Sequence, residues 1–320
     1  MSSYITRKTP GDSAWFTHDR FGMFIHFGLY SMPGRHEWVK MHECITEEKY
    51  DKYFQYFNPD LFDAGELARA AKAAGMKYAV LTAKHHEGFC MYDSAYTDYK
   101  VTNTPFGRDV IAELAEACYK HGIKLGLYYS QSIDWAHPDG NSGTEEQPLN
   151  MCDMPWGNEW DYPDASIKDY SRCFNEKIKP QVKEILTNYG DLLLVWFDIP
   201  LGIPEWCSQE LYDMVKLYQP NCLVNSRIGN GKCDYTSAGD NVIPEHDVSG
   251  MLYESPVTLN DTWGYKPSDQ NWKSPERIIE IRNNLKSKGA NLLLNLGPDG
   301  LGRIPAKSVE ILRKVGELSR

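Results

Sequence analysis

Short apolar runs alternate with amphipathic stretches along most of the chain. The runs are rich in β-branched and aromatic residues, which is typical of strands buried on both faces of a parallel sheet. They cover residues 22–27, 77–83, 124–130, 192–198, 222–225 and 290–296, with a weaker candidate at 251–254. Helical spacing of apolar residues follows several of these runs, at 62–74, 108–121, 166–189, 205–217, 275–288 and 305–318.

This alternation of strand and helix predicts an α/β fold. Six or seven strands are visible, and we expect the irregular segment 227–272, rich in Gly, Asp and Pro, to hide one or two more. A single catalytic (β/α)8 TIM-like barrel domain over residues 1–320, with irregular or missing strands, fits this pattern best. An open doubly wound sheet is the alternative, but no glycine-rich nucleotide-binding motif follows a strand.

Composition and charge narrow the class of protein. The net charge of −10 argues against a nucleic-acid-binding surface, which would need clustered Lys and Arg. No apolar run approaches the roughly 20 residues that span a bilayer, so we expect no membrane contact. The eight cysteines form no C-x-x-C pair and the N-terminus has no apolar leader segment, which together favour a cytoplasmic protein with reduced thiols.

Polar and titratable residues follow the apolar runs, where the catalytic groups of a barrel gather. They are His26, the Lys84–Glu87 segment, the Tyr128–Tyr129 pair, Asn225 with Arg227, Asp198 and, at a weaker strand, Glu254. Asp198 ends the apolar run LLLVWFD and follows Trp196 and Phe197. It could cap the next loop, but a carboxylate among aromatic rings at a barrel mouth also suits a nucleophile toward an anomeric carbon.

A glycosidase needs a second carboxyl group, about 5–5.5 Å away in retaining enzymes and about 6.5–9.5 Å away in inverting ones. Glu245 and Glu254 are the candidates. The adjacent His85 and His86 suit hydrogen bonds to sugar hydroxyls better than a metal site, because the chain has no H-x-H or H-E-x-x-H motif. We therefore expect neither a metal nor another cofactor.

Long motifs of the chain resemble those of the α-L-fucosidases of glycoside hydrolase family 29. The motifs occur in order from about residue 15 to about residue 305 and are WFTHDRFGMFIHFGLYSMPG, HEW, KYAVLTAKHHEGFCMYDSAYTDY, GRDV, GLYYSQSIDW, VWFD, NSR, TWGY and GANLLLNLGPDGLGRIP. The resemblance implies an irregular barrel and an exo-acting hydrolase of fucosylated oligosaccharides or glycosides. It also implies a retaining mechanism through a covalent fucosyl-enzyme.

The resemblance also implies roles for single residues. Asp198 matches the nucleophile. Glu245 matches the acid/base better than Glu254, which is its alternative and is otherwise expected to bind substrate. The remaining matches are positions that contact the sugar: His26, Glu37, Trp38, His85, His86, Tyr128, Arg227 and Trp263.

One departure from the family pattern affects these expectations. Many members carry a β-sandwich after the barrel, and this chain stops one helix after the last motif. A homo-oligomer is one way to cover the rim that the sandwich would contact. Two other functions stay open at this point: a non-catalytic fucose-binding barrel, and a metal-dependent hydrolase that uses His26, His85, His86 and Asp198.

Overall fold

Eight parallel strands form one sheet in the computed structural model, which describes residues 13–140, 150–151, 154–200 and 202–319. The strands are β1 (Phe21–Ile25), β2 (Tyr78–Lys84), β3 (Lys124–Ser130), β6 (Leu194–Asp198), β7 (Leu223–Val224), β8 (Thr236–Ser237), β9 (Tyr253–Thr258) and β10 (Asn291–Leu296). β1 pairs with both β2 and β10, so the first and last strands along the chain are neighbours. The order β7-β6-β3-β2-β1-β10-β9-β8 therefore follows the chain around a ring.

The two edges of this sheet meet and close the barrel. Asn225, just after β7, forms a parallel bridge with Tyr235, just before β8. The backbone N–H of Asp234 donates to the carbonyl of Val224 at 2.8 Å in the same place. The predicted eight-stranded α/β barrel is thus confirmed, with its two shortest strands at the seam.

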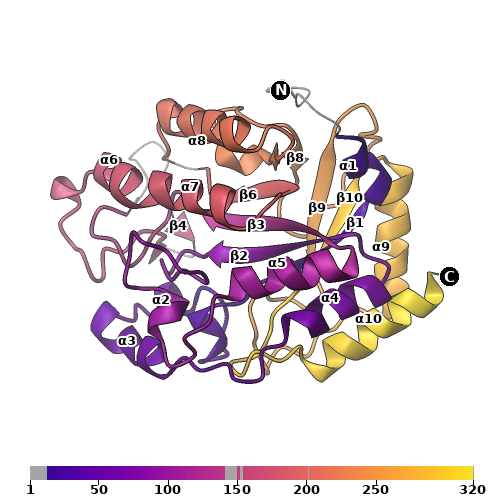
Figure 1. Cartoon of the computed structure of the whole chain (residues 1–320), viewed down its shortest axis with the longest axis horizontal. Coiled ribbons are helices and arrows are strands. Elements are labelled where there is room, and N and C mark those ends of the chain that lie inside the picture. Colours follow the sequence, from indigo (N-terminus) through magenta and orange to yellow (C-terminus); the bar gives the residue numbers. More distant parts are fainter. Residues whose placement is uncertain (1–12, 141–149, 152–153, 201, 320) are drawn as a thin grey trace.

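Helices cover the outside of most strands. They are α4 (Ala64–Ala73), α5 (Val110–His121), α7 (Lys179–Asn188), α8 (Glu205–Tyr218), α9 (Pro275–Ser287) and α10 (Ala306–Leu318). α5, α4 and α10 lie side by side along one flank (Figure 1). The segment 223–258, all of it described, contains the short 3-10 turn η5 (Ser226–Ile228) and no α-helix, which explains why its strands are hard to recognise in the sequence.

The predicted helix over 166–189 is broken into several pieces. The structure has η3 (Ala165–Ile167), α6 (Tyr170–Cys173), the π-helical turn η4 (Phe174–Ile178) and then α7. Pro180 lacks an N–H, and its ring would clash with the carbonyl of Glu176 in a regular α-helix. A π-helical turn before the proline avoids that clash.

Three early helices carry little sequence signal. α1 (Ala14–Asp19) and α2 (Val39–His42) are too short to show a periodicity, and α3 (Glu47–Tyr56) buries only Tyr50. α2, α3 and α6 belong to the connections that follow strands, together with the hairpin of β4 (Asn150–Met151) and β5 (Met154–Pro155). Figure 1 shows them at the left of the view, with α1 at the other end of the barrel.

The barrel interior is built largely from aromatic rings. Phe24, Tyr78, Tyr128, Trp196 and Tyr235 form one buried cluster inside the sheet. Gly22 makes room for this packing, because a Cβ atom there would lie 2.3 Å from the Tyr78 ring. The rings fill the barrel below its mouth and form the floor of the site.

Two further sequence expectations concern the thiols and the membrane. The seven cysteines that lie in the described ranges are all free, and Cys152 lies outside those ranges. Among the described helices, none is long and apolar enough to cross a bilayer.

Candidate active site

A cavity of about 230 Å³ opens at the end of the barrel where the strands finish. Eight of the residues predicted for the site line it: His26, Glu37, Trp38, His85, Tyr128, Asp198, Arg227 and Trp263. They come from six different strand ends or connections, so the barrel topology brings them together. The chain thus places two carboxyl groups, two imidazoles, a guanidinium and several aromatic rings around a space of this size.

Asp198 is held in a fixed orientation at the end of β6. Its Oδ1 accepts hydrogen bonds from Nη1 of Arg227 and from the backbone N–H of Ile199, each at 2.9 Å. Its Oδ2 accepts one from the Tyr128 hydroxyl at 3.0 Å. Ile199 has φ +54°, a strained conformation for a β-branched residue, and this conformation aims its N–H at the carboxylate. Oδ2 is the less engaged of the two oxygens.

Arg227 joins two carboxylates. Its Nη1 donates to Asp198, and its Nη2 donates to Oδ1 of Asp240 at 2.6 Å. The guanidinium also lies over the Trp196 ring, 4.7 Å from its centroid. Burial alone would lower the pKa of Arg227, but the two carboxylates raise it above its ordinary value, so the group stays charged. Asp198 and Asp240 thus bind the same guanidinium through its two terminal nitrogens.

His26 presents a hydrogen-bond acceptor to the cavity. Its Nδ1 lies 2.7 Å from Oδ1 of Asn295. The amide nitrogen of Asn295 donates to the carbonyl of Trp263 at 2.7 Å, so its oxygen is the group that faces His26. Nδ1 of His26 therefore carries the hydrogen, and Nε2 carries the lone pair. Burial lowers the pKa of His26 to about 4, which keeps this ring neutral at neutral pH.

His86 has the same tautomer for a similar reason. The Ser130 hydroxyl donates to the carbonyl of Ile133 at 2.8 Å, so it accepts from Nδ1 of His86 at 2.7 Å. His86 is fully buried behind the cavity lining, with Nε2 3.6 Å from Oδ2 of Asp198. This Nε2 atom has no hydrogen-bond partner within the described residues. The site thus holds a second imidazole acceptor next to the Asp198 carboxylate.

Glu37 contributes a third acceptor. Its Oε2 accepts from the backbone N–H of Gly264 at 2.8 Å, whereas its buried Oε1 has no hydrogen-bond partner in the described part of the chain. Burial raises the pKa of Glu37 to about 7. Gly264 fits closely here, since a Cβ atom would lie 3.0 Å from Cβ of Glu37 and from the Tyr30 ring. Partnerless buried acceptors of this kind are costly unless a ligand supplies hydroxyl donors.

Aromatic rings form the floor and the wall of the cavity. Tyr128 stacks on Trp196 at 5.6 Å between centroids and 19° between planes, and on His85 at 5.6 Å and 17°. Trp263 packs 5.3 Å from His26, and Trp38 packs 4.8 Å from His86. Flat apolar faces beside hydrogen-bond acceptors suit a sugar, which presents both C–H faces and hydroxyl groups.

The structure does not bring Glu245 to this site. Glu245 is exposed and does not line the cavity. Its neighbour Pro244 accepts a hydrogen bond from Lys288, and Val248 bonds the backbone of the same lysine, which follows α9. The chain here runs along the outside of the barrel toward the start of β9, away from the mouth. The prediction of Glu245 as the acid/base is therefore not supported by its position.

Glu254 is buried inside the barrel and away from the cavity. The sequence suggests a strand ending at Glu254, whereas β9 begins one residue earlier, so Glu254 lies at the opposite end of the barrel from the mouth. It accepts hydrogen bonds from Tyr78 at 2.7 Å and from Nε1 of Trp196 at 3.1 Å. Burial raises its pKa to about 7. Glu254 supports the aromatic floor and has no direct access to a ligand in the cavity.

The sequence analysis missed Asp240, the second carboxylate that binds Arg227 beside Asp198. It lines the cavity, lies three residues after the end of β8, and its side chain is half exposed to solvent. The rule that polar residues follow strands would have found it, had the two-residue strand β8 been visible. The other lining residues that were missed are Phe24, His36, Trp156, Trp196, Ile199 and Asp261.

Across the described ranges, no three His, Cys, Asp or Glu side chains are arranged as ligands of one metal ion. Hydrogen bonds to neighbouring groups fix the orientation of Asp198, Arg227 and His26.

Comparisons with known proteins match this geometry. The sequence model of the α-L-fucosidase family matches residues 5–319. The α-L-fucosidase of Dictyostelium discoideum is 28% identical over 97% of this chain and 70% of its own length, and the rat tissue α-L-fucosidase is 30% identical over 95% and 67%.

Solved structures extend the likeness to three dimensions. The α-L-fucosidase AlfC of Lactobacillus casei, in complex with its product α-L-fucose, has a TM-score of 0.90 and 45% identity, over 95% of this chain and 97% of that one. Isoenzyme 1 of Paenibacillus thiaminolyticus has a TM-score of 0.87 and 43% identity, over 96% and 75%. The chain belongs to the α-L-fucosidases, a family of glycoside hydrolases.

Proposed function

We propose that this enzyme cleaves terminal α-L-fucosides with retention of configuration and that Asp198 is the nucleophile. In the first step, Oδ2 of Asp198 forms a bond to C1 of the fucosyl group while the bond from C1 to the leaving oxygen breaks. Water then forms a bond to C1 and the ester to Asp198 breaks, which releases α-L-fucose. The observation that carries this assignment is the fixed carboxylate of Asp198, which lines the cavity and in which Oδ2 is the less engaged oxygen.

Asp240 is the best placed acid/base. In the first step it would donate a proton to the leaving oxygen, and in the second it would take a proton from the attacking water. It shares Arg227 with Asp198, and its half-exposed side chain lies where water can enter. Neither Glu245 nor Glu254 has both properties.

The acceptors of the cavity account for selection of the sugar. Nε2 of His26, Nε2 of His86 and Oε1 of Glu37 can each accept a hydroxyl hydrogen, and Tyr128 and Trp263 cover apolar C–H groups. The volume of about 230 Å³ is smaller than the roughly 300–1,000 Å³ of drug-sized pockets, which suits one pyranose ring and hence cleavage at a chain end.

The first natural substrate to test is fucose α(1,6)-linked to N-acetylglucosamine. An Asp-to-Ala variant of AlfC has been solved with this disaccharide and also with 4-nitrophenyl α-L-fucoside. This chain is 43% identical to the disaccharide complex over 96% of its length. We therefore propose both compounds as substrates of this enzyme.

Proton NMR of the reaction mixture tests the mechanism. With 4-nitrophenyl α-L-fucoside, retention predicts that α-L-fucose appears first and that its β anomer grows in by mutarotation. Initial release of the β anomer would show a single displacement and would remove the nucleophilic role of Asp198.

A further inference from the structure

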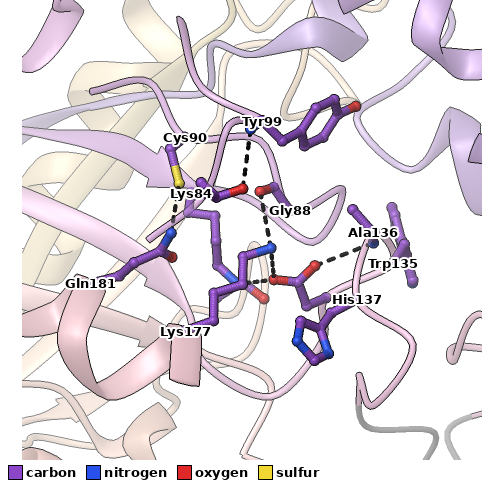
Figure 2. Close-up of polar contacts among 12 residues, drawn as sticks. Lys84, Gly88, Cys90, Tyr99, Trp135, Ala136, His137, Lys177 and Gln181 are labelled. Carbon is purple, nitrogen blue, oxygen red and sulfur yellow. Dashed lines mark hydrogen bonds and ion pairs between the residues drawn. The ribbon is translucent and has the colours of Figure 1, made fainter. Parts of the chain in front are cut away.

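Three charged side chains lie buried together behind His86. Nζ of Lys84, at the end of β2, is 2.9 Å from Oδ2 of Asp134, and Nζ of Lys177, on the π-helical turn η4, is 2.7 Å from the same oxygen. Figure 2 shows the two lysines converging on the segment that carries Ala136 and His137. We call this group the Lys84–Asp134–Lys177 cluster.

The cluster carries one more positive than negative charge. The exposed fractions are 0% for Lys84, 1% for Asp134 and 6% for Lys177. Burial alone would raise the pKa of Asp134, but the two ammonium groups hold it below its usual range, so the carboxylate stays ionised. One carboxylate balances only one ammonium. An unmatched buried cation is costly, and a 1:1 pair would anchor the same segments. The second lysine therefore calls for a role beyond anchoring.

The cluster is directly connected to His86. The chain passes from Lys84 to His86 in two residues, and the backbone N–H of Trp135, next to Asp134, donates to the carbonyl of His86 at 2.8 Å. The other groups that face His86 come from the surrounding strand ends. The cations are Lys84 and Arg227, the carboxylates are Asp134, Asp198 and Asp240, and the neutral rings are His26 and His85.

A carboxylate 3.6 Å from an imidazole favours the imidazolium. Protonated His86 would pair with Oδ2 of Asp198 and occupy the oxygen proposed to attack. Its Nε2 would also change from an acceptor into a donor, and the match to a sugar hydroxyl would be lost. The His86 ring must therefore stay neutral, both to leave Oδ2 of Asp198 free and to accept a sugar hydroxyl.

We propose that the excess positive charge of the Lys84–Asp134–Lys177 cluster keeps His86 neutral beside Asp198. Burial is the largest influence that lowers the pKa of His86, to about 3, and the charge of Lys84 comes next. Lys84, Asp134 and Lys177 are thus positioning residues that act through His86. The proposal has an electrostatic half, that the cluster keeps His86 neutral, and a functional half, that a neutral His86 leaves Asp198 free to react. Only the functional half rests on the nucleophilic role of Asp198.

The substitution Lys84→Met tests the electrostatic half. It leaves a matched Asp134–Lys177 pair, so no buried charge is left without a partner and the fold is retained. Lys84→Arg keeps the charge and serves as the control. Imidazole nitrogen shifts are followed by NMR on histidine-labelled protein between pH 4 and pH 8, and the His86 signals are assigned by their loss in His86→Gln.

The expected result is that wild type and Lys84→Arg keep His86 in its Nδ1–H neutral form down to the acid limit of the folded protein. In Lys84→Met the midpoint of His86 rises by about two units, into the measured pH range. Lys177→Met also leaves a matched pair, keeps Lys84 in place, and should shift the midpoint upward by less. Identical His86 titrations in the wild type and both methionine variants would overturn the proposal.

Activity at acidic pH tests the functional half. Between pH 7 and pH 4.5, Lys84→Met should lose at least threefold more of its kcat/KM than Lys84→Arg does. A raised His86 midpoint with no extra loss of activity would overturn the link to Asp198. Failure of the retaining mechanism would appear instead as β-L-fucose in the NMR assay above, so the two failures are distinguishable.

Discussion

The Tyr128 hydroxyl donates a 3.0 Å hydrogen bond to Oδ2 of Asp198, and both residues line the cavity. Burial and the neighbouring Asp198 charge raise the pKa of Tyr128 well above its ordinary value, so the hydroxyl stays a donor throughout the working pH range. The same ring stacks on Trp196 and His85. One side chain thus orients the carboxylate and forms part of the cavity floor.

Tyr128→Phe removes this donor and leaves the ring in place. A hydrogen bond to a charged group contributes about 1.5–3 kcal/mol, so we expect kcat/KM for 4-nitrophenyl α-L-fucoside to fall by roughly 10- to 100-fold. Tyr129→Phe is the matched control, because that buried hydroxyl bonds Gln181, outside the barrel, at 2.7 Å. Equal losses in the two variants would indicate a general packing effect and contradict the orienting role.

Asp240→Ala and Glu245→Ala separate the two candidate acids. Loss of the acid should lower kcat/KM by about 100-fold or more for the disaccharide, and by less for an aryl fucoside with a good leaving group. Azide should restore turnover of the aryl fucoside by Asp240→Ala and give α-L-fucosyl azide, because it replaces water in the second displacement. Glu245→Ala should behave as wild type, because its side chain is exposed outside the cavity. The reverse pattern would restore Glu245 as the acid.

Glu254→Gln tests the buried carboxyl beneath Trp196. The folded state holds its proton up to about pH 7, whereas the unfolded chain releases it near pH 4.5, so this group makes the wild-type free energy of unfolding fall as pH rises from 4.5 to 7. Glutamine cannot ionise. Relative to wild type, the free energy of unfolding of Glu254→Gln should increase by roughly 2–3 kcal/mol from pH 5 to pH 8, measured by urea unfolding. If variant and wild type differ in free energy of unfolding by the same amount at pH 5 and pH 8, Glu254 is ionised in the fold.

Gly264→Ala tests the close contact behind Glu37. The added methyl group would lie 3.0 Å from Cβ of Glu37 and push that side chain from its position. We expect kcat/KM to fall by about tenfold, mostly through a higher KM, because an acceptor for a sugar hydroxyl is displaced. Gly250→Ala is the control, since no atom lies within 4 Å of a Cβ there. Unchanged KM in both variants would show that Glu37 does not contact the substrate.

Much of the fold follows from local sequence patterns. β3 and β6 are continuous apolar runs buried along nearly their whole length, and α5 ends at Gly122, which has φ +70°. β8 could not be found in this way, because a two-residue strand has no periodicity. The π-helical turn η4 depends on a single proline, Pro180, inside an otherwise helical pattern.

The sequence located site residues best where the strand before them has a clear apolar pattern. Asp198 and His26 follow strands that the pattern shows clearly, and both line the cavity. Asp240 follows the hidden strand β8, so the search for a second carboxyl moved down the chain to Glu245. Glu254 was placed at the wrong end of its strand, because the start of β9 is not marked by a change in apolar pattern.

Trapping the intermediate tests the role of Asp198 most directly. A 2-deoxy-2-fluoro-α-L-fucosyl fluoride should form the covalent enzyme through its good leaving group and then hydrolyse slowly, because the 2-fluoro group destabilises the oxocarbenium-like transition state. Peptide mapping by mass spectrometry should place one fluorofucosyl group on Asp198, and Asp198→Ala should take up none. Labelling of another carboxylate, with Asp198 unmodified, would contradict the assignment.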